Sequence, residues 1–173
     1  MYPKIKHSVF TFDNEKKLKE IVENYNNLIS FGNGRSYGDS ALNKYIINMK
    51  PHHSFISFDE INGVLHVQSG ILLSDILAVI VPKGWFLKVT PGTQLVTVGG
   101  AIASDVHGKN HHIDGCFSDS IIMFNLMMPN GEIVTCSKQE NAPLFKATCG
   151  GMGLTGIIYS CKIKLKKIYR LFP

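Results

Sequence analysis

Two glycine-rich stretches hold most of the residues that could do chemistry. The first, residues 31–39, reads FGNGRSYGD, and the second, residues 90–112, reads TPGTQLVTVGGAIASDVHGKNHH. Glycines remove side chains, so successive backbone N–H groups can converge on an anion, and Arg35 adds a guanidinium fork. We expect both stretches to lie against one large anionic, aromatic ligand. Taken alone, the first stretch is equally typical of a surface turn that needs glycine.

A third glycine cluster, residues 150–156, contains GMGLTG, which matches the dinucleotide-binding pattern G-x-G-x-x-G. That pattern requires a strand before it and a helix after it. Here a segment typical of a strand, residues 157–163, follows at once. We therefore expect a tight turn beside the ligand and reject a Rossmann site for a nicotinamide dinucleotide.

Histidines and cysteines could bind a metal or form redox-active pairs, but their spacing in this sequence argues against both. His107, His111 and His112 lie close together, but no carboxylate or cysteine completes a set at metal-ligand spacing, so we expect no metal. The four cysteines are Cys116, Cys136, Cys149 and Cys161. They form no C-x-x-C pair, which favours reduced, structural thiols in a cytoplasmic protein. We expect His52 and His53 to lie in a solvent-facing loop.

Composition narrows the class of protein. The 173 residues allow one domain or two small lobes, and the net charge of +5 suits an anionic ligand. No basic run is interleaved with aromatic residues, so we expect no nucleic-acid partner. The longest apolar runs are far too short to cross a bilayer, and the first residues do not resemble a signal peptide.

Hydrophobic periodicity predicts alternating strands and helices that position these loops. A helix begins after Asp13 as its N-cap, and two Asn-Gly pairs, at 62–63 and 130–131, predict hairpins. The other helices are expected at 70–81, 98–106 and 142–147. The strands are expected at 9–12, 28–31, 45–49, 55–61, 64–68, 85–89, 118–128, 132–137 and 157–168. The first glycine loop thus leaves the end of a strand, where α/β folds commonly place their sites.

Three blocks together carry a resemblance to a known family. Residues 32–39 (GNGRSYGD), 90–112 and 150–157 (GGMGLTGI) resemble, in order and spacing, the FAD-binding domain of the p-cresol methylhydroxylase/vanillyl-alcohol oxidase superfamily. The likeness is greatest to its decaprenylphosphoryl-ribose 2-oxidase group. It implies an α+β fold with two subdomains, 1–91 with a small mixed sheet and 92–173 with a larger, mainly antiparallel sheet.

The resemblance also implies which residues bind FAD. The first loop would hold the pyrophosphate through Gly32, Asn33, Gly34, Arg35, Ser36, Tyr37 and Gly38. The second would lie beside the flavin through Pro91, Gly92, Thr93, Val98, Gly99, Gly100 and Ala101. A turn toward the substrate pocket would add Ser104, Asp105, His107, Gly108, Lys109 and Asn110, and the third cluster Gly156 and Ile157.

The implied activity is oxidation of a sugar or alcohol C–OH by hydride transfer to flavin N5. His107 and Lys109 are the candidate catalytic residues, the lysine stabilising a reduced, anionic flavin and the histidine acting on a substrate hydroxyl. The alternative for His107 is a structural histidine that closes the turn from Ser104. Several relatives tether FAD through a histidine where this chain has Arg35, so we expect non-covalent FAD.

Members of this family continue with a substrate-binding domain, which we expect to be absent from this chain. A sugar or polyol substrate would then be bound through that missing domain or a partner chain. Three hypotheses stay open: the cofactor half of an oxidoreductase, a catalytically incomplete FAD-binding module, and a nucleotide-binding protein that has lost FAD.

Overall fold

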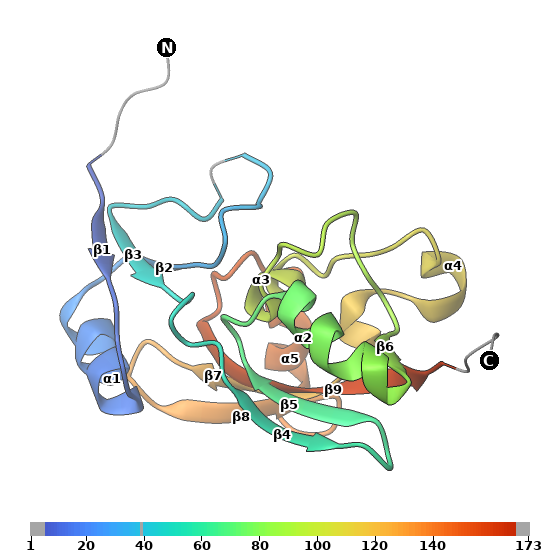
Figure 1. Ribbon diagram of the computed structural model, residues 1–173. Helices are drawn as coiled ribbons and strands as arrows, with labels where there is room; N and C mark the ends of the chain where they lie inside the picture. The colour runs from blue at the N-terminus through green and yellow to red at the C-terminus, as the bar shows by residue number, and fades with distance from the viewer. Residues whose placement is uncertain (1–5, 39, 169–173) are drawn as a thin grey trace.

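The computed structural model describes residues 6–38 and 40–168, which form two lobes (Figure 1). The small lobe contains β1 (Ser8–Phe10), α1 (Glu15–Asn24), β2 (Leu28–Phe31) and β3 (Tyr45–Asn48). Its strands are ordered β1-β3-β2 and are parallel throughout, where a mixed sheet was expected. Helix α1 is capped by Asn14 and not by Asp13, because the Asn14 side chain accepts a hydrogen bond from the Lys17 N–H.

The large lobe is built on an antiparallel sheet. Its strands are β4 (Phe55–Asp59), β5 (Val64–Gln68), β6 (Trp85–Leu87), β7 (Ile121–Met127), β8 (Ile133–Ser137) and β9 (Ile157–Lys167). The order is β4-β5-β9-β7-β8, and β6 pairs with the end of β9. Both Asn-Gly hairpins are confirmed, with Gly63 and Gly131 at φ 61° and 75°. The expected fold class is therefore confirmed.

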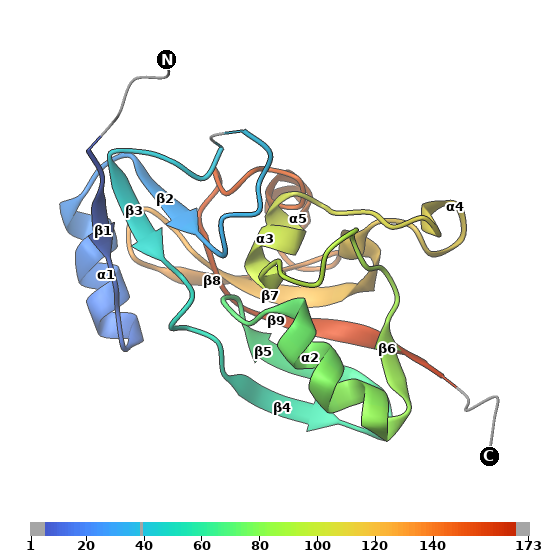
Figure 2. The ribbon, with the colours of Figure 1, turned by 45° about the horizontal axis from the view of Figure 1, so that its top comes forward.

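Helices cover one face of this sheet, as Figure 2 shows for α2 and α3. The α-helices are α2 (Leu73–Ile80), α3 (Val98–Ala103), α4 (His111–Asp114) and α5 (Ala142–Thr148). Two 3₁₀ turns, η1 (Val81–Lys83) and η2 (Phe117–Ser120), complete the set. Helix α2 begins three residues later than expected, because Leu72 is in a β-bridge with Thr97. The strand expected from Ser118 likewise begins at Ile121, after η2.

The two lobes share one end of the large sheet. Leu126 and Ile158 pack into the core beneath the helices, whereas their neighbours Met127 and Ile157 pack with the small lobe. Adjacent residues of a strand point to opposite faces, so the small lobe covers the face that the helices leave free. The chain passes from the small sheet to the large sheet between β3 and β4. The proposed division at residue 91 therefore falls within the part of the chain that builds the large lobe.

His52 lies at this junction, and its expected place in a solvent-facing loop is wrong. The residue is only 7% exposed, while His53 is exposed as expected. The His52 ring lies 4.3 Å from the Tyr159 ring and 5.2 Å from the Phe12 ring, between centroids. Its Nε2 lies 3.0 Å from the Tyr159 carbonyl oxygen. A neutral imidazole that donates this bond ties the small lobe to β9.

The free energy of unfolding is expected to fall as the pH is lowered, because of His52. Desolvation by burial lowers the pKa of His52 below its ordinary value, so the unfolded chain binds a proton at a higher pH than the folded chain. This contribution is present in full above about pH 6.5 and is lost as pH falls toward the folded pKa. Urea unfolding at pH 7.5 and 5.5 checks it. His52→Gln should show a smaller loss than the wild type, and His53→Gln should stay closer to the wild type, because His53 contributes only the smallest part of the lowering of the His52 pKa. Equal losses in all three proteins would refute the assignment to His52.

Candidate functional site

A groove runs between the lobes and is lined by all three glycine-rich loops. It consists of three hollows that share lining residues. The central hollow shares Ser30, Ser40, Gly153 and Gly156 with one neighbour. It shares Gly32, Ser36, Thr97, Gly100 and Ser104 with the other. The loops after β2, after β6 and after α3 lie on the same side of the molecule (Figures 1 and 2). Residues far apart in sequence therefore form one continuous surface.

The first loop presents unbonded backbone N–H groups. None of the N–H groups from Asn33 to Gly38 donates a hydrogen bond to a residue that the structure describes. Gly34 and Gly38 have φ near 62° and 64°, which L side chains rarely adopt. Arg35 and Tyr37 are exposed, and Asp39, at the end of the expected loop, lies outside the described residues. Such a run of free amides is suited to binding an anion.

The first and second loops hold each other in place. The Asn33 side-chain amide donates to the Leu95 carbonyl oxygen at 2.8 Å. A Cβ on Gly32 would overlap the Thr97 hydroxyl, so only glycine permits this close approach. Thr97 in turn caps α3 by accepting from the Gly100 N–H at 3.2 Å. The amides of Val98, Gly99 and Gly100 are all used within the protein, so the start of α3 offers no free donor at these three residues.

Most of the residues expected to bind the cofactor line the groove, residues 107–110 line a neighbouring pocket, and four residues line neither. Val98 and Ala101 are fully buried, and their side chains pack into the core of the large lobe. They support α3 from beneath. Gly38 does not line the groove, although it stands at the end of the free-amide loop. The fourth residue is Asp105, whose carboxylate is engaged elsewhere.

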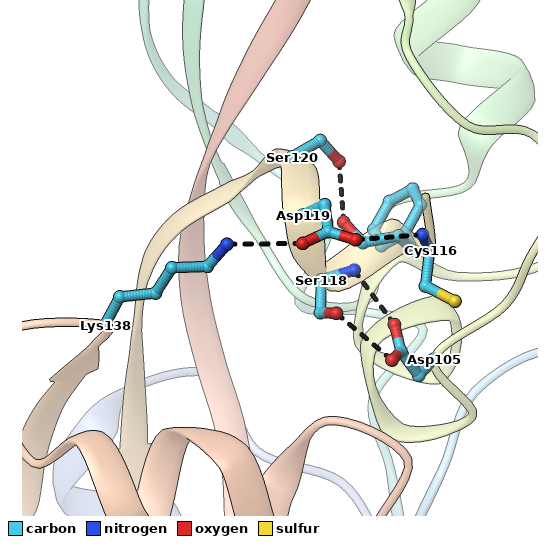
Figure 3. A network of polar contacts seen from close by, with 7 residues as sticks. Asp105, Cys116, Ser118, Asp119, Ser120 and Lys138 are labelled. Carbon is cyan, nitrogen blue, oxygen red and sulfur yellow. Dashed lines mark hydrogen bonds and ion pairs between the residues drawn. The ribbon is translucent and has the colours of Figure 1, made fainter. Parts of the chain in front are cut away.

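Asp105 organises the turn that follows α3 (Figure 3). Its two carboxylate oxygens accept hydrogen bonds from the Ser118 N–H at 2.9 Å and the Ser118 hydroxyl at 3.1 Å. Asp119 extends this network by accepting from the Cys116 N–H and pairing with Lys138 at 3.3 Å. Asp105 itself has φ 40°, a conformation that a non-glycine residue keeps only when its surroundings impose it. The network thus fixes the path of residues 104–107.

His107 and Lys109 project from this turn into a second pocket, which we call the His107 pocket. Its lining residues are Phe86, Leu87, Lys88, Thr90, Pro91, Gly92, His107, Gly108, Lys109, Asn110, His111, Asp114, Lys166 and Ile168. Pro91 and Gly92 also line the groove, so the pocket and the groove adjoin. Both candidate catalytic side chains are exposed. Neither has a hydrogen-bond partner among residues 6–38 and 40–168.

The rest of the His107 pocket is held by fixed polar contacts. The Asn110 side-chain amide donates to the Lys88 carbonyl oxygen at 3.0 Å and to the Asp114 carboxylate at 2.7 Å. The hydrogen bond from Asn110 lowers the pKa of Asp114, and so does the contact of Lys166 with the same carboxylate at 3.2 Å. Asn110, expected to bind the cofactor, therefore has a positioning role here. With Lys88, Lys109 and Lys166 in its lining, the pocket favours anionic or oxygen-rich groups.

Metal and thiol chemistry find little support in the part of the chain that is described. His107 and His111 lie 5.6 Å apart between ring centroids, but no group of three or more possible ligands comes together there. All four cysteines are free. Desolvation raises the pKa of Cys149 to about 12 and also raises the pKa of Cys116, so both stay protonated at neutral pH. None of the described helices has the length and apolar character needed to cross a membrane.

Several groove residues were not predicted from the sequence. Ser30 stands at the end of β2 and Ser69 directly after β5, and both hydroxyls are buried without a partner within the described chain. Met152, with φ 52°, also lines the groove. The position of Ser30, two residues before the first glycine, is the one signal that could have indicated it. Nothing local distinguishes Ser69.

These features define a class of protein: a two-lobed domain with a glycine-lined, amide-rich groove for an anionic cofactor. A family model described as "FAD binding domain" matches residues 7–137, and the chain belongs to this family of FAD-binding domains. FAD is thus the cofactor of the family to which the chain belongs. The glycines, free amides and unpartnered hydroxyls fit a ligand rich in oxygen atoms. The resemblance inferred from the three sequence blocks is confirmed.

Three relatives illustrate the similarity. The chain is 40% identical over 141 residues to decaprenylphosphoryl-beta-D-ribose oxidase of Mycolicibacterium smegmatis, covering 80% of this chain and 31% of that protein. It is 30% identical over 125 residues to D-lactate dehydrogenase of Anaerostipes hadrus, covering 69% and 26%. It is 29% identical over 136 residues to L-gulonolactone oxidase of Mus musculus, covering 77% and 30%. The chain spans less than a third of the length of these relatives.

Proposed function

We propose that this chain is the FAD-binding part of an oxidoreductase that oxidises a C–OH group of a sugar or another alcohol by hydride transfer to flavin N5. The observation that carries the proposal is the run of amides from Asn33 to Gly38 that donate to none of the described residues, in a loop at the edge of the groove. It provides donors for a pyrophosphate in a chain that belongs to an FAD-binding family. Several relatives are a ribose oxidase and lactone oxidases by name, which favours a sugar-like substrate.

The chain's own residues would divide the work as follows. The amides of the first loop bind the pyrophosphate, with Arg35 adding positive charge, and Gly100 lines the groove beside them. FAD, when bound, supplies the hydride acceptor. In the His107 pocket, Lys109 places a cation beside the end of the groove marked by Pro91 and Gly92. His107 would hold or orient the proton of a substrate hydroxyl.

We further propose that FAD is held without a covalent bond. Arg35 occupies the position at which several relatives carry a tethering histidine, and arginine cannot form that link. Other members of the superfamily use a second tether through a cysteine, and the raised pKa of the Cys116 thiol argues against such a link here, because the thiolate is the nucleophile. The turn containing Cys116 is instead used structurally, since its N–H donates to Asp119.

A second candidate is an FAD-binding module that depends on another domain or chain for catalysis. Its support is the exposure of His107 and Lys109, which have no hydrogen-bond partner among the described residues. A partner carrying the substrate site would cover this pocket. A substrate-binding part carried by another domain or chain belongs to the same proposal.

One experiment separates these possibilities. FAD is added to the purified 173-residue chain, and the absorbance spectrum is followed without oxygen while aldoses, polyols and D-lactate are added in turn. Bleaching by a sugar or polyol supports the oxidoreductase, and it should be at least tenfold slower in Lys109→Met. Bound FAD that no donor bleaches favours the module. Acid precipitation should then release the yellow colour into the supernatant, and colour in the pellet would contradict non-covalent binding.

A further inference from the structure

Two serine hydroxyls in the groove are buried without a hydrogen-bond partner. Ser69 is 2% exposed, and its Oγ has no partner within the described residues. The Oγ of Ser30 is buried in the same way, although the residue as a whole is only half-buried. Burying a hydroxyl away from water without a new partner costs free energy, so such groups are rare in folded proteins.

The other buried hydroxyls of the described chain do have partners. The Ser120 hydroxyl donates to the Phe117 carbonyl oxygen at 2.6 Å, and the Thr148 hydroxyl donates to the Leu144 carbonyl oxygen at 2.8 Å. The Ser160 hydroxyl contacts His66 and Asn125. Within the described chain, the buried hydroxyls that lack a partner are thus confined to one place, the central hollow of the groove. This pattern indicates that an occupant of the groove supplies the missing partners.

The two hydroxyls come from different lobes and are rigidly held. Ser30 belongs to β2 of the small sheet, and Ser69 follows β5 of the large sheet. The Ser69 N–H donates to Tyr159 at 3.1 Å, and its carbonyl oxygen accepts from Gly99 at 2.8 Å. A Cβ on Gly99 would come within 3.0 Å of the Ser69 side chain, so α3 packs directly on this residue. Ser69 therefore cannot turn its backbone away to find another partner.

The lining of this hollow selects the part of the ligand that it meets. Among the described residues, its lining contains serine, threonine, glycine and apolar residues and no charged side chain. It is continuous, through Gly32 and Ser36, with the loop that presents free amides. Neutral O–H and N–H donors that converge without a counter-charge are suited to phosphate oxygens, which accept but do not donate.

We propose that Ser30 and Ser69 donate hydrogen bonds to the pyrophosphate oxygens of FAD, clamping it from both lobes. The proposal rests on the FAD placement given above and adds two binding residues to it. It makes the cofactor a bridge between the small and the large sheet. Neither hydroxyl has a hydrogen-bond partner within the described chain, and each would gain a charge-assisted hydrogen bond when FAD binds. Each serine should therefore contribute to FAD affinity and not to the stability of the free protein.

The test uses Ser30→Ala, Ser69→Ala and the control Ser120→Ala. FAD affinity is measured by flavin fluorescence, ADP affinity by displacement of FAD, and the melting temperature without ligand. We expect each groove variant to bind FAD and ADP about tenfold more weakly, with an unchanged or higher melting temperature. Ser120→Ala should melt lower, because it loses a bond made in the free protein, and should bind FAD with unchanged affinity.

The outcomes are distinguishable. If the wild type binds no FAD, the proposed function fails and this proposal fails with it. If the wild type binds FAD and both groove variants bind it equally well, only the serine proposal is overturned. ADP that does not displace FAD, or that binds the groove variants as it binds the wild type, overturns the assignment to the pyrophosphate. A lower melting temperature with unchanged affinity assigns the serines a structural role and also overturns it.

Discussion

Gly70→Ala is expected to lower the free energy of unfolding by at least about 3 kcal/mol and the melting temperature by about 6–12 °C. A Cβ at this position would overlap the Met49 carbonyl oxygen and come within 2.6 Å of the His52 carbonyl oxygen. Both are backbone atoms, so no side-chain rotation relieves the clash. The Gly70 N–H also donates to His52 at 2.8 Å. The substitution therefore pushes apart the segment that joins the lobes.

Gly92→Ala is the matched control for this effect on stability. No atom lies within 4 Å of a Cβ built on Gly92, and its φ is not in the left-handed region. Its free energy of unfolding should stay within about 0.5 kcal/mol of the wild type. Thermal and urea unfolding of the three proteins give the comparison. Similar stability of Gly70→Ala and Gly92→Ala would mean that the close approach at Gly70 is not real.

Local signals made much of the fold predictable. The pairs Asn62-Gly63 and Asn130-Gly131 specify hairpins because the turn needs positive φ, and both hairpins form. Strand β9 and helix α1 follow their hydrophobic periods. Element ends were less predictable where a distant partner sets them. Helix α2 starts late because Thr97, 25 residues after Leu72, pairs with the segment before it.

In the candidate site, too, features set by the local sequence were predictable and features set by distant partners were not. The glycine loops were predictable because three glycine-rich blocks occur in an order and spacing that resemble an FAD-binding domain, although the first block alone is equally typical of a surface turn. Asp105 looked like a cofactor-binding residue, but its partner is Ser118, which no local pattern could specify. Ser69 owes its position to a contact with Gly99 within the large lobe, and His52 owes its position to a contact with Tyr159 between the lobes. Such contacts depend on the assembled fold.

Adding FAD is expected to slow amide hydrogen exchange across residues 33–38 by about 100-fold when FAD is present at 100 times its Kd. These amides make no hydrogen bonds to the described residues, so without ligand nothing but the loop's own conformation protects them. Phosphate oxygens would become their acceptors. Mass spectrometry of exchanged peptides, with FAD binding followed separately by fluorescence, measures the effect. The β4–β5 hairpin around Ile61, which does not line the groove, serves as the internal control.

Gly32→Ala provides the variant control, because a Cβ there would overlap the Thr97 hydroxyl and displace the first loop from the second. At the same FAD concentration this variant should show little protection of residues 33–38. The decisive measurement is the exchange of these residues in the wild-type chain with FAD bound. The account predicts strong slowing at 33–38 and none around Ile61. Bound FAD that leaves exchange at 33–38 unchanged would contradict it.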